Sequence, residues 1–273
     1  MMRSLWSAAS GMKGQQTAVD TIANNIANVN TSGYKTQSTQ FKTLLYQTLE
    51  SQSTNAAGET KPTSAQVGLG TRVASINTNF TQGSMTSTET LTDLCINGEG
   101  FFAIRGNSED EVFYTRAGSF TWALDANGER ILTTSDGYGV LDQDGEIITI
   151  PATAGTQGFA VDEEGAVSYR NDDGTYTATG QTIALYQFAN RVGLEKVGDN
   201  LYSQTAASGE PQAEWEADGI TRSSIAQGYL EASNVNVADE MVNLIVAQRA
   251  YQLNSKAITT TDTMLEEANN LKR

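Results

Sequence analysis

Four short acidic or amide segments that end in glycine recur through the middle of the chain, at residues 125–128, 142–145, 162–165 and 171–174. Their carboxylates raise the possibility of calcium binding, because Asp142, Asp144 and Gly145 imitate part of an EF-hand loop. With Gly145 at loop position six, however, the first ligand would be Val140 and the bidentate glutamate would be Pro151. This register argues against an EF-hand, and the segments instead predict tight hairpin turns in which glycine takes a positive φ.

Adjacent carboxylates, such as Glu163 with Glu164, are the residue types that glycosidases use to cleave polysaccharides. They fall in the predicted surface turns, and nothing in the surrounding sequence indicates a pocket that would raise the pKa of a catalytic acid. The sequence also has no phosphate-binding glycine loop and no serine nucleophile elbow. A secreted wall-active enzyme stays open as an alternative, but we predict that the chain is not an enzyme and has no catalytic site.

Histidine is absent from the sequence, and Cys95 is its only cysteine. An internal disulfide is therefore impossible, and the commonest zinc ligands are missing. Cys95 stands between Leu94 and Ile96, a setting that predicts a small buried hydrophobic residue and not a nucleophile. We predict no cofactor-binding site and no metal site.

The 273 residues carry a net charge of −15, and this charge is unevenly distributed. Residues 1–45 hold four basic residues and one acidic residue, and residues 230–273 hold four and six, so the middle of the chain accounts for about −16. An acidic middle repels nucleic acid and anionic membranes. No apolar run reaches the roughly 18 residues that span a bilayer, and the N-terminus lacks the apolar core of a signal peptide. We predict no nucleic-acid partner, no membrane insertion and no cleaved leader.

Both ends of the chain carry an apolar residue at every seventh position, a spacing that predicts long helices able to pair as a coiled coil. The alternative is that they are ordinary amphipathic helices that cap one globular core. The predicted stripe residues are Leu5, Met12, Val19, Ile22 and Ile26 near the start, and Val237, Leu244, Tyr251, Ile258 and Leu265 near the end.

Small residues, including Gly11 and Gly14, follow another face of the first helix and would let a second backbone come close. Each interior glycine weakens a helix by about 1 kcal/mol relative to alanine. We therefore expect this end to be largely unfolded in the free monomer and to fold when neighbours pack against it.

These patterns predict an α+β fold with paired terminal helices and an all-β central domain. We expect four segments: a helix in 1–35, a hairpin-like connection in 36–90 with a mobile polar stretch at 51–66, a β-rich outer domain in 91–225, and a second helix in 226–273. Within the β-rich segment, five aromatic residues are expected in the core. They are Phe101, Phe102, Tyr114, Phe120 and Trp122.

Three ordered motifs resemble the bacterial flagellar rod and hook family of axial proteins. The N-terminal motif includes Asn24, Asn25, Asn28, Gly33, Tyr34 and Lys35. The C-terminal motif covers residues 228–237 and 248–257 and includes Asn234, Asn236, Gln248, Arg249, Tyr251, Asn254 and Lys256. The central motif covers residues 97–102 and 114–120. The resemblance spans essentially the whole chain and is greatest to the distal-rod branch of the family.

The resemblance implies a structural subunit of the distal rod in the flagellar basal body. Such a subunit polymerises with itself into a helical tube that transmits motor torque to the hook and encloses the export channel. The implied partners are other rod proteins and the hook protein along the axis, the P-ring and L-ring proteins around the rod, and the type III export apparatus. The implied assembly interface comprises the two apolar stripes together with Gly11 and Gly14. A proximal-rod or hook-type member, or a soluble binding module with helical ends, stays as an alternative.

Overall fold

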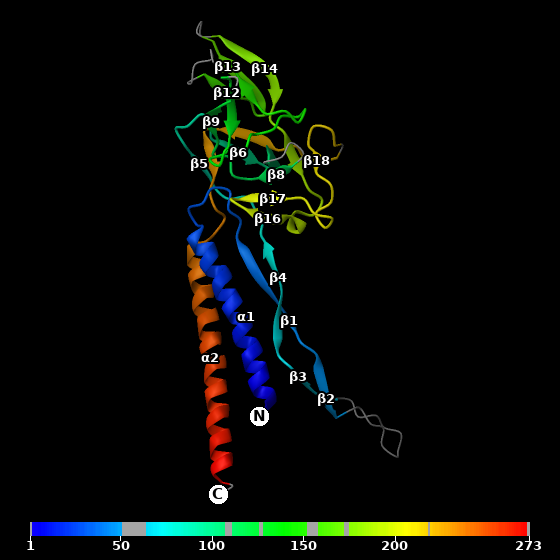
Figure 1. Ribbon diagram of the computed structural model, residues 1–273, viewed down its shortest axis with the longest axis vertical. Coiled ribbons are helices and arrows are strands. Elements are labelled where there is room, and N and C mark those ends of the chain that lie inside the picture. Colours follow the sequence, from blue (N-terminus) through cyan, green and yellow to red (C-terminus); the bar gives the residue numbers. More distant parts are fainter. Residues whose placement is uncertain are drawn as a thin grey trace, which may run out of the picture. The chain divides into compact units, whose positions relative to one another are not determined.

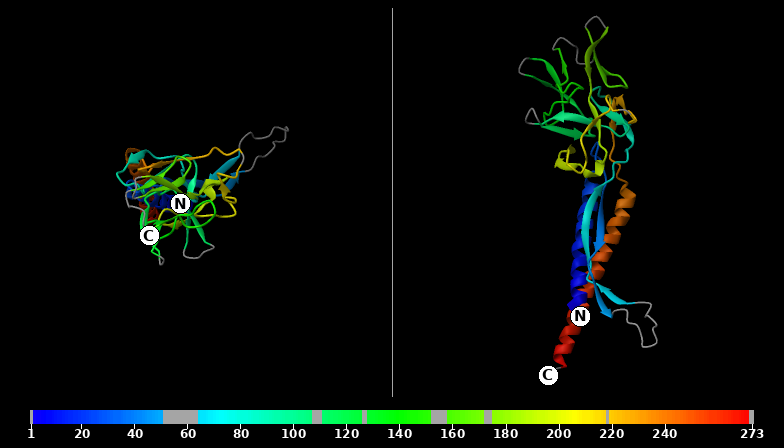
Figure 2. Two further views of the ribbon diagram at one scale, coloured as in Figure 1. Left: turned by 90° about the horizontal axis from the view of Figure 1, so that it is seen from above. Right: turned by 90° about the vertical axis from the view of Figure 1, so that its right-hand side faces the viewer.

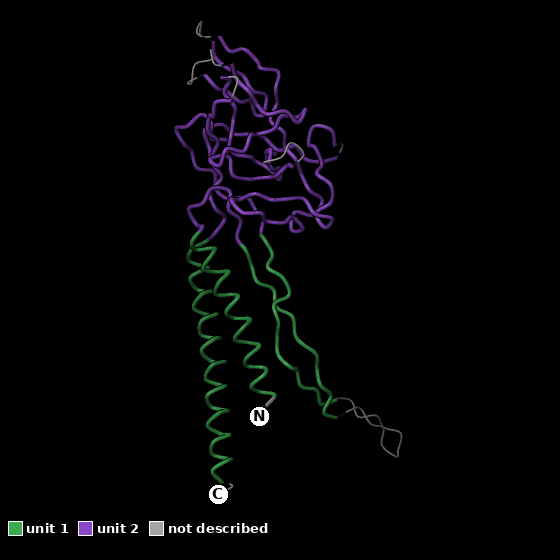
Figure 3. Tube along the Cα trace, in the orientation of Figure 1, with its two compact units in different colours: residues 1–27, 37–78, 236–273 green, residues 28–36, 79–235 purple. Residues whose placement is uncertain are grey.

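The computed structural model describes residues 2–50, 64–106, 111–125, 128–151, 158–171, 175–217 and 219–271. It has an α+β fold with a long helix at each end of the chain and a β-rich middle (Figure 1). The chain divides into two compact units (Figure 3). Unit 1 comprises residues 1–27, 37–78 and 236–273, and unit 2 comprises residues 28–36 and 79–235. The segment boundaries expected at residues 35, 90 and 225 do not coincide with those of the units.

Unit 1 contains the two terminal helices, α1 (Met2–Ala27) and α2 (Val237–Asn270). The Asn236 side chain caps α2, because it accepts a hydrogen bond from the Ala238 amide at 3.1 Å. Asp239 and Glu240 occupy the first turn, where their negative charges interact favourably with the positive end of the helix dipole. In the described residues, neither helix is both long and apolar enough to cross a membrane.

The rest of unit 1 is a long antiparallel hairpin. Strand β1 (Gln37–Thr43) pairs with β4 (Thr71–Thr78), and β2 (Tyr46–Glu50) continues the hairpin by pairing with β3 (Ala65–Gly68). Residues 51–63 of the polar stretch predicted to be mobile lie outside the described residues, whereas Ala65 and Gln66 belong to β3.

Unit 2 is built from short strands and one turn of 3-10 helix, η1 (Arg191–Gly193). Its largest sheet has six strands in the order β16-β17-β8-β7-β15-β18. The strands of unit 2 are β5 (Met85–Ser87), β6 (Leu94–Asn97), β7 (Phe101–Arg105), β8 (Val112–Thr115), β9 (Thr121–Leu124), β10 (Arg130–Thr133), β11 (Thr149–Ile150), β12 (Phe159–Val161), β13 (Ala166–Arg170), β14 (Tyr176–Thr182), β15 (Leu185–Gln187), β16 (Glu195–Gly198), β17 (Leu201–Ser203), β18 (Gln212–Ala213), β19 (Ser224–Gln227) and β20 (Tyr229–Glu231).

Strand β7 organises the core of unit 2, because its alternating side chains fill both sides of the large sheet. Phe102 and Ile104 belong to one buried apolar cluster, and Phe101 and Ala103 belong to a second. Successive side chains of a strand point to opposite faces, and both faces are buried here. Residues 101–104 are therefore all apolar. Of the aromatic residues expected in the core, Phe101, Phe102, Tyr114 and Phe120 are buried, and Trp122 is partly buried against the first cluster.

Candidate assembly site

The two helices of unit 1 pack against each other in antiparallel orientation (Figures 1 and 2). The Asn25 amide donates a hydrogen bond to the Glu240 carboxylate at 3.0 Å, and a Cβ placed on Gly11 would lie 2.8 Å from Nδ2 of Asn254. From Gly11 to Asn25 the chain advances 14 residues along α1, and from Asn254 to Glu240 it retreats 14 residues along α2. This interval equals two heptads, so one seven-residue register relates the contacts on both helices.

Small and polar side chains occupy the centre of this helix pair. On α2 the buried residues are Ala247 and Thr261, which continue the same seven-residue series as Glu240 and Asn254. The buried residues of α1 include Ala18, and a helix with such a face approaches its neighbours closely. The interface centre thus falls three residues after the stripe predicted on α2.

The predicted apolar stripes lie beside this centre and are not fully covered. Leu5, Met12, Val19, Ile22 and Ile26 on α1, and Leu244 and Ile258 on α2, are half-buried. Val237, Tyr251 and Leu265 are exposed, with 43%, 40% and 37% of their surface accessible. Sequence periodicity located the stripes, but it could not show that the small-residue face would take the inner position within unit 1.

A second face of α1 lies against the hairpin. The Asn25 side chain pairs with the backbone of Gln37 through two hydrogen bonds of 2.8 and 3.0 Å, and the Thr39 hydroxyl donates to the Thr21 hydroxyl at 3.1 Å. A Cβ on Gly14 would lie 3.1 Å from the Phe41 ring. Asn25 is therefore fully buried because it joins α1 to both β1 and α2.

Unit 2 contains a buried ionic cluster formed by one carboxylate and two cations. The Glu231 carboxylate lies 2.6 Å from Nζ of Lys35 through Oε1 and 3.1 Å from Nε of Arg116 through Oε2. All three side chains are at least 97% buried. Lys35, Arg116 and Glu231 belong to the N-terminal, central and C-terminal motifs, so the cluster brings the three motifs together at one point.

Both cations also donate hydrogen bonds to backbone carbonyls, whereas Nε of Arg116 and Oε2 of Glu231 make only the ionic contact with each other. Lys35 donates to the Thr81 carbonyl at 2.9 Å, and Arg116 donates to the carbonyls of Gly98 and Gly100 at 2.9 and 2.6 Å. Satisfying these donors offsets part of the cost of removing the charges from water. Burial, together with the adjacent Arg116, lowers the pKa of Lys35, although Glu231 opposes the shift.

The backbone at Gly33 also depends on this arrangement. Its amide donates to the Glu231 carbonyl at 2.8 Å, and its φ of 71° is a value that glycine adopts without strain. A Cβ at this position would lie 2.6 Å from the Ala117 amide nitrogen, so a larger residue would collide with the backbone. Tyr34, next in the motif, is buried.

Asn234 joins separate segments of unit 2 through both ends of its side chain. Its Oδ1 accepts hydrogen bonds from the amide and hydroxyl of Thr36, each at 2.7 Å. Its Nδ2 donates to the carbonyls of Asn79 and Thr81 at 2.9 and 3.0 Å. The segments that enter and leave the β-rich unit, which are 153 or more residues apart, are thereby held side by side.

The remaining motif residues have more local surroundings. Asn28 directly follows α1, and its carbonyl and side-chain oxygens accept hydrogen bonds from the amide and the hydroxyl of Thr31. Arg249 donates to the exposed Gln252 side chain at 3.2 Å. Asn24, Gln248, Arg249 and Lys256 are exposed.

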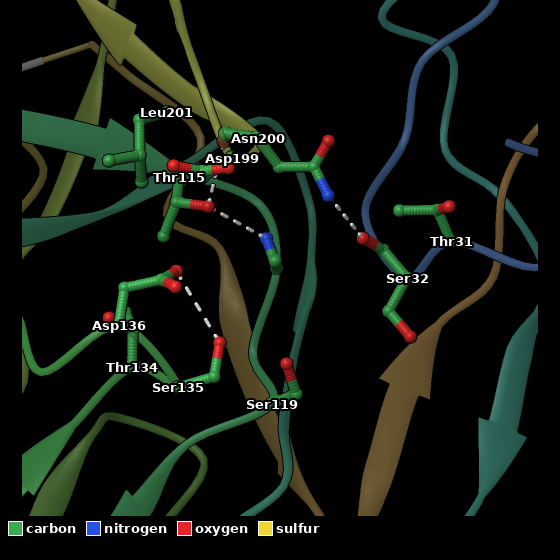
Figure 4. Close-up of a pocket in the computed structure, with 11 residues that line it drawn as sticks. Thr31, Ser32, Thr115, Ser119, Thr134, Ser135, Asp136, Asp199, Asn200 and Leu201 are labelled. Carbon is green, nitrogen blue, oxygen red and sulfur yellow. Dashed lines mark hydrogen bonds between the residues drawn. The ribbon is translucent and has the colours of Figure 1, made fainter.

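A polar pocket of about 170 Å³ lies in unit 2, and hydroxyl groups of serine and threonine line much of it (Figure 4). Asn200 donates to the Ser32 carbonyl at 3.2 Å, and Thr115 donates to the Asn200 carbonyl at 3.0 Å. Asp136 and Asp199 also line the pocket. Within the described residues, no group of three or more acidic or cysteine side chains is placed to hold a metal ion.

The acidic segments form turns where the structure describes them. Gly145 and Gly165 have φ values of 80° and 88°, and the Asp142 carboxylate accepts hydrogen bonds from the amides of Asp144 and Glu146 at 3.0 and 2.9 Å. The carboxylate thus stabilises its own turn. Residues 126–127 and 172–174 of the other two segments lie outside the described residues.

Sequence reasoning missed the pairing of Glu231 with Arg116 and Lys35. All three residues lie inside the motifs, and the available signal was a charged side chain with a glycine two or three residues away. The sequence correctly predicted that Cys95 is buried, but it did not indicate that Cys95 lies near this cluster. Burial, reinforced by Glu231, raises the pKa of the Cys95 thiol to about 11.

Three family profiles match the chain in the order of its motifs. Residues 5–35 match the flagella basal body rod protein family, and residues 95–169 match the D1 domain of the flagellar hook protein FlgE/F/G family. Residues 226–271 match the C-terminal region of the flagellar basal body rod FlgEFG proteins. The matched regions contain α2, most of α1, and all three residues of the ionic cluster.

Full-length relatives agree with the profiles. The flagellar basal-body rod protein FlgG of Borreliella burgdorferi is 46% identical over the full length of both chains, and FlgG of Bacillus subtilis is 42% identical, also over the full length of both. FlgG of Agrobacterium fabrum is 41% identical over 96% of this chain and 97% of its own. The chain therefore belongs to the FlgG family of flagellar basal-body rod proteins.

Proposed function

We propose that this chain is a structural subunit of the distal rod, and that it polymerises through unit 1 into the helical tube that transmits motor torque to the hook. The observation that carries this proposal is the antiparallel pair of α1 and α2, with contacts spaced by two heptads and apolar stripes left partly uncovered at its sides. We propose that the pair acts as a coiled-coil element whose stripes meet neighbouring subunits. Trp6, 73% exposed on α1, adds to this apolar surface.

The division of charge between the units supports an arrangement with unit 1 inside the tube. Unit 1 holds nine basic and eight acidic residues, whereas unit 2 holds eight basic and 24 acidic residues. Copies of a nearly neutral unit can pack without mutual repulsion, but copies of a unit with net charge −16 repel one another. Unit 2 would therefore form the outer domain, an all-β module that faces the P-ring and L-ring proteins.

Assembly at the growing tip would follow export of the unfolded chain through the type III apparatus and the channel that the tube encloses. Gly11 and Gly14 lower the stability of an isolated α1 by about 2 kcal/mol in total. In the folded unit an added Cβ at these positions would lie 2.8 Å from the Asn254 side chain and 3.1 Å from the Phe41 ring. The same glycines would thus keep the free helix weak and allow tight packing after assembly.

Replacing Val19 or Leu244 with Asp tests the proposal, because each change puts a charge on a half-buried stripe residue. We expect unit 2 to stay folded and rod assembly to be lost, with loss of motility. The assay is electron microscopy of basal bodies from cells in which the variant is the only copy of this chain. Gln248→Asp is the matched control, because it puts the same charge on an exposed position of α2, the helix that carries Leu244. This variant should assemble. Normal rods from both Val19→Asp and Leu244→Asp would refute the role of these stripes.

A further inference from the structure

Helix α2 carries a second apolar stripe, separate from the one that sequence periodicity predicted. Its members are all exposed, with 53–88% of their surface accessible. They are Val242, Val246, Leu253 and Met264 on α2, and Leu271 at its C-cap. Successive members are 4, 7, 11 and 7 residues apart, intervals made of the threes and fours that keep side chains on one helical face.

This second stripe lies beside the face of α2 that contacts α1, and its member Val246 lines an open groove with residues of α1 and β1. With 3.6 residues per turn, it lies about 100° around α2 from the line through Ala247, Asn254 and Thr261, which faces α1. The five members stay within about 40° of one another on the helical wheel. The contact with α1 therefore covers one side of α2 and leaves an apolar surface exposed along nearly the whole helix.

We infer that the second stripe, from Val242 to Leu271, is the docking surface for unit 1 of a second copy of this chain. This inference rests on the proposed function and specifies which face of α2 makes the contact between subunits. The stripe extends over about 44 Å at 1.5 Å per residue, so its partner must also be long and straight. The helices α1 and α2 of another copy, with 26 and 34 residues, have this length.

Charge also favours a second copy over other partners. The charged residues of α2 nearest the stripe include both signs, with Arg249 and Glu267 on the same flank. The exposed side of α1 likewise presents Lys13 and Asp20, so two copies of unit 1 can match opposite charges beside an apolar seam. A helix that lies on a membrane surface instead has a polar face rich in Lys and Arg, which α2 does not have.

Cysteine protection tests the inference in the full chain. Leu253→Cys places a thiol on the stripe, and Gln252→Cys places one on the neighbouring exposed position, about 100° away. The native Cys95 contributes little background, because it is buried and its pKa is about 11. Each variant is labelled with a maleimide as the purified soluble chain and within isolated basal bodies.

We expect labelling of Leu253→Cys to be at least tenfold slower in basal bodies than in the soluble chain, and labelling of Gln252→Cys to change much less. Equal labelling of Leu253→Cys in the two states, with the chain present in basal bodies, would overturn the inference and leave the proposed function intact. Absence of the wild-type chain from basal bodies would overturn the proposed function itself. Protection of the soluble chain by phosphatidylglycerol vesicles would identify a membrane surface as the partner and also overturn the inference.

Discussion

At the residue scale, the Lys35–Glu231–Arg116 cluster contains two cations and one anion, so its members contribute unequally to the stability of the fold. Glu231 is the single anion between two cations that are both nearly inaccessible to water. Removing it would leave two buried positive charges, whereas removing Lys35 would leave the Arg116–Glu231 ion pair. Breaking a buried ion pair typically costs about 3–5 kcal/mol.

We therefore predict that Glu231→Gln lowers the free energy of unfolding by about 3–5 kcal/mol, and that Lys35→Met lowers it by less. Lys35→Met should cost less because burial already disfavours the charged form of Lys35 and lowers its pKa. Urea denaturation of the two variants beside the wild type measures both differences. A Lys35→Met variant that loses as much stability as Glu231→Gln would contradict this view of the cluster.

The buried thiol of Cys95 gives a pH dependence with a definite sign. Burial raises its pKa from 9.0 to about 11, so between these values the thiol ionises in the unfolded chain before it ionises in the folded one. Its stabilising contribution is complete below pH 9 and is lost as the pH rises toward 11, by up to about 1.4 kcal/mol per pH unit. We predict that the wild type loses more stability than Cys95→Ala between pH 8 and pH 10, measured by urea denaturation. Equal losses in the two proteins would show that the thiol is not responsible.

At the scale of elements, the turn at Gly33 directs the chain into unit 2. Gly33 and Gly137 both have positive φ values, of 71° and 89°, but a Cβ would meet nearby backbone only at Gly33. Gly137→Ala should cost about 1–2 kcal/mol through backbone strain alone. We predict a substantially larger loss for Gly33→Ala, measured by thermal unfolding. Equal destabilisation by the two substitutions would show that the close approach to Ala117 has no energetic importance.

The elements differed in how far the sequence could predict them. The seven-residue repeat located α2, because periodicity is a local property of the chain. The convergence of Lys35, Arg116 and Glu231 depends on tertiary pairing across about 200 residues, and no local pattern encodes that distance. The inner position of the small-residue face was similarly hidden, since periodicity shows that a helix has two faces but not which face a neighbour covers.

At the scale of the whole molecule, the two units have opposite physical character. Unit 2 contains the buried apolar clusters and the ionic cluster, and unit 1 contains most of the exposed large apolar residues of the described chain. We predict that a chain of residues 28–235, which lacks both terminal helices, folds cooperatively in unit 2 and stays monomeric. Circular dichroism and sedimentation velocity measure these two properties. Loss of the β signal would show that unit 2 needs the helices in order to fold.

Electron cryomicroscopy of isolated basal bodies tests the central claim most directly, because it locates every copy of the chain in the rod. The account predicts that α1 and α2 of adjacent copies pack side by side around the export channel, with Leu253 in the contact and unit 2 outside. A rod in which unit 2 forms the inner wall, and the apolar stripes of α2 face solvent, would contradict it.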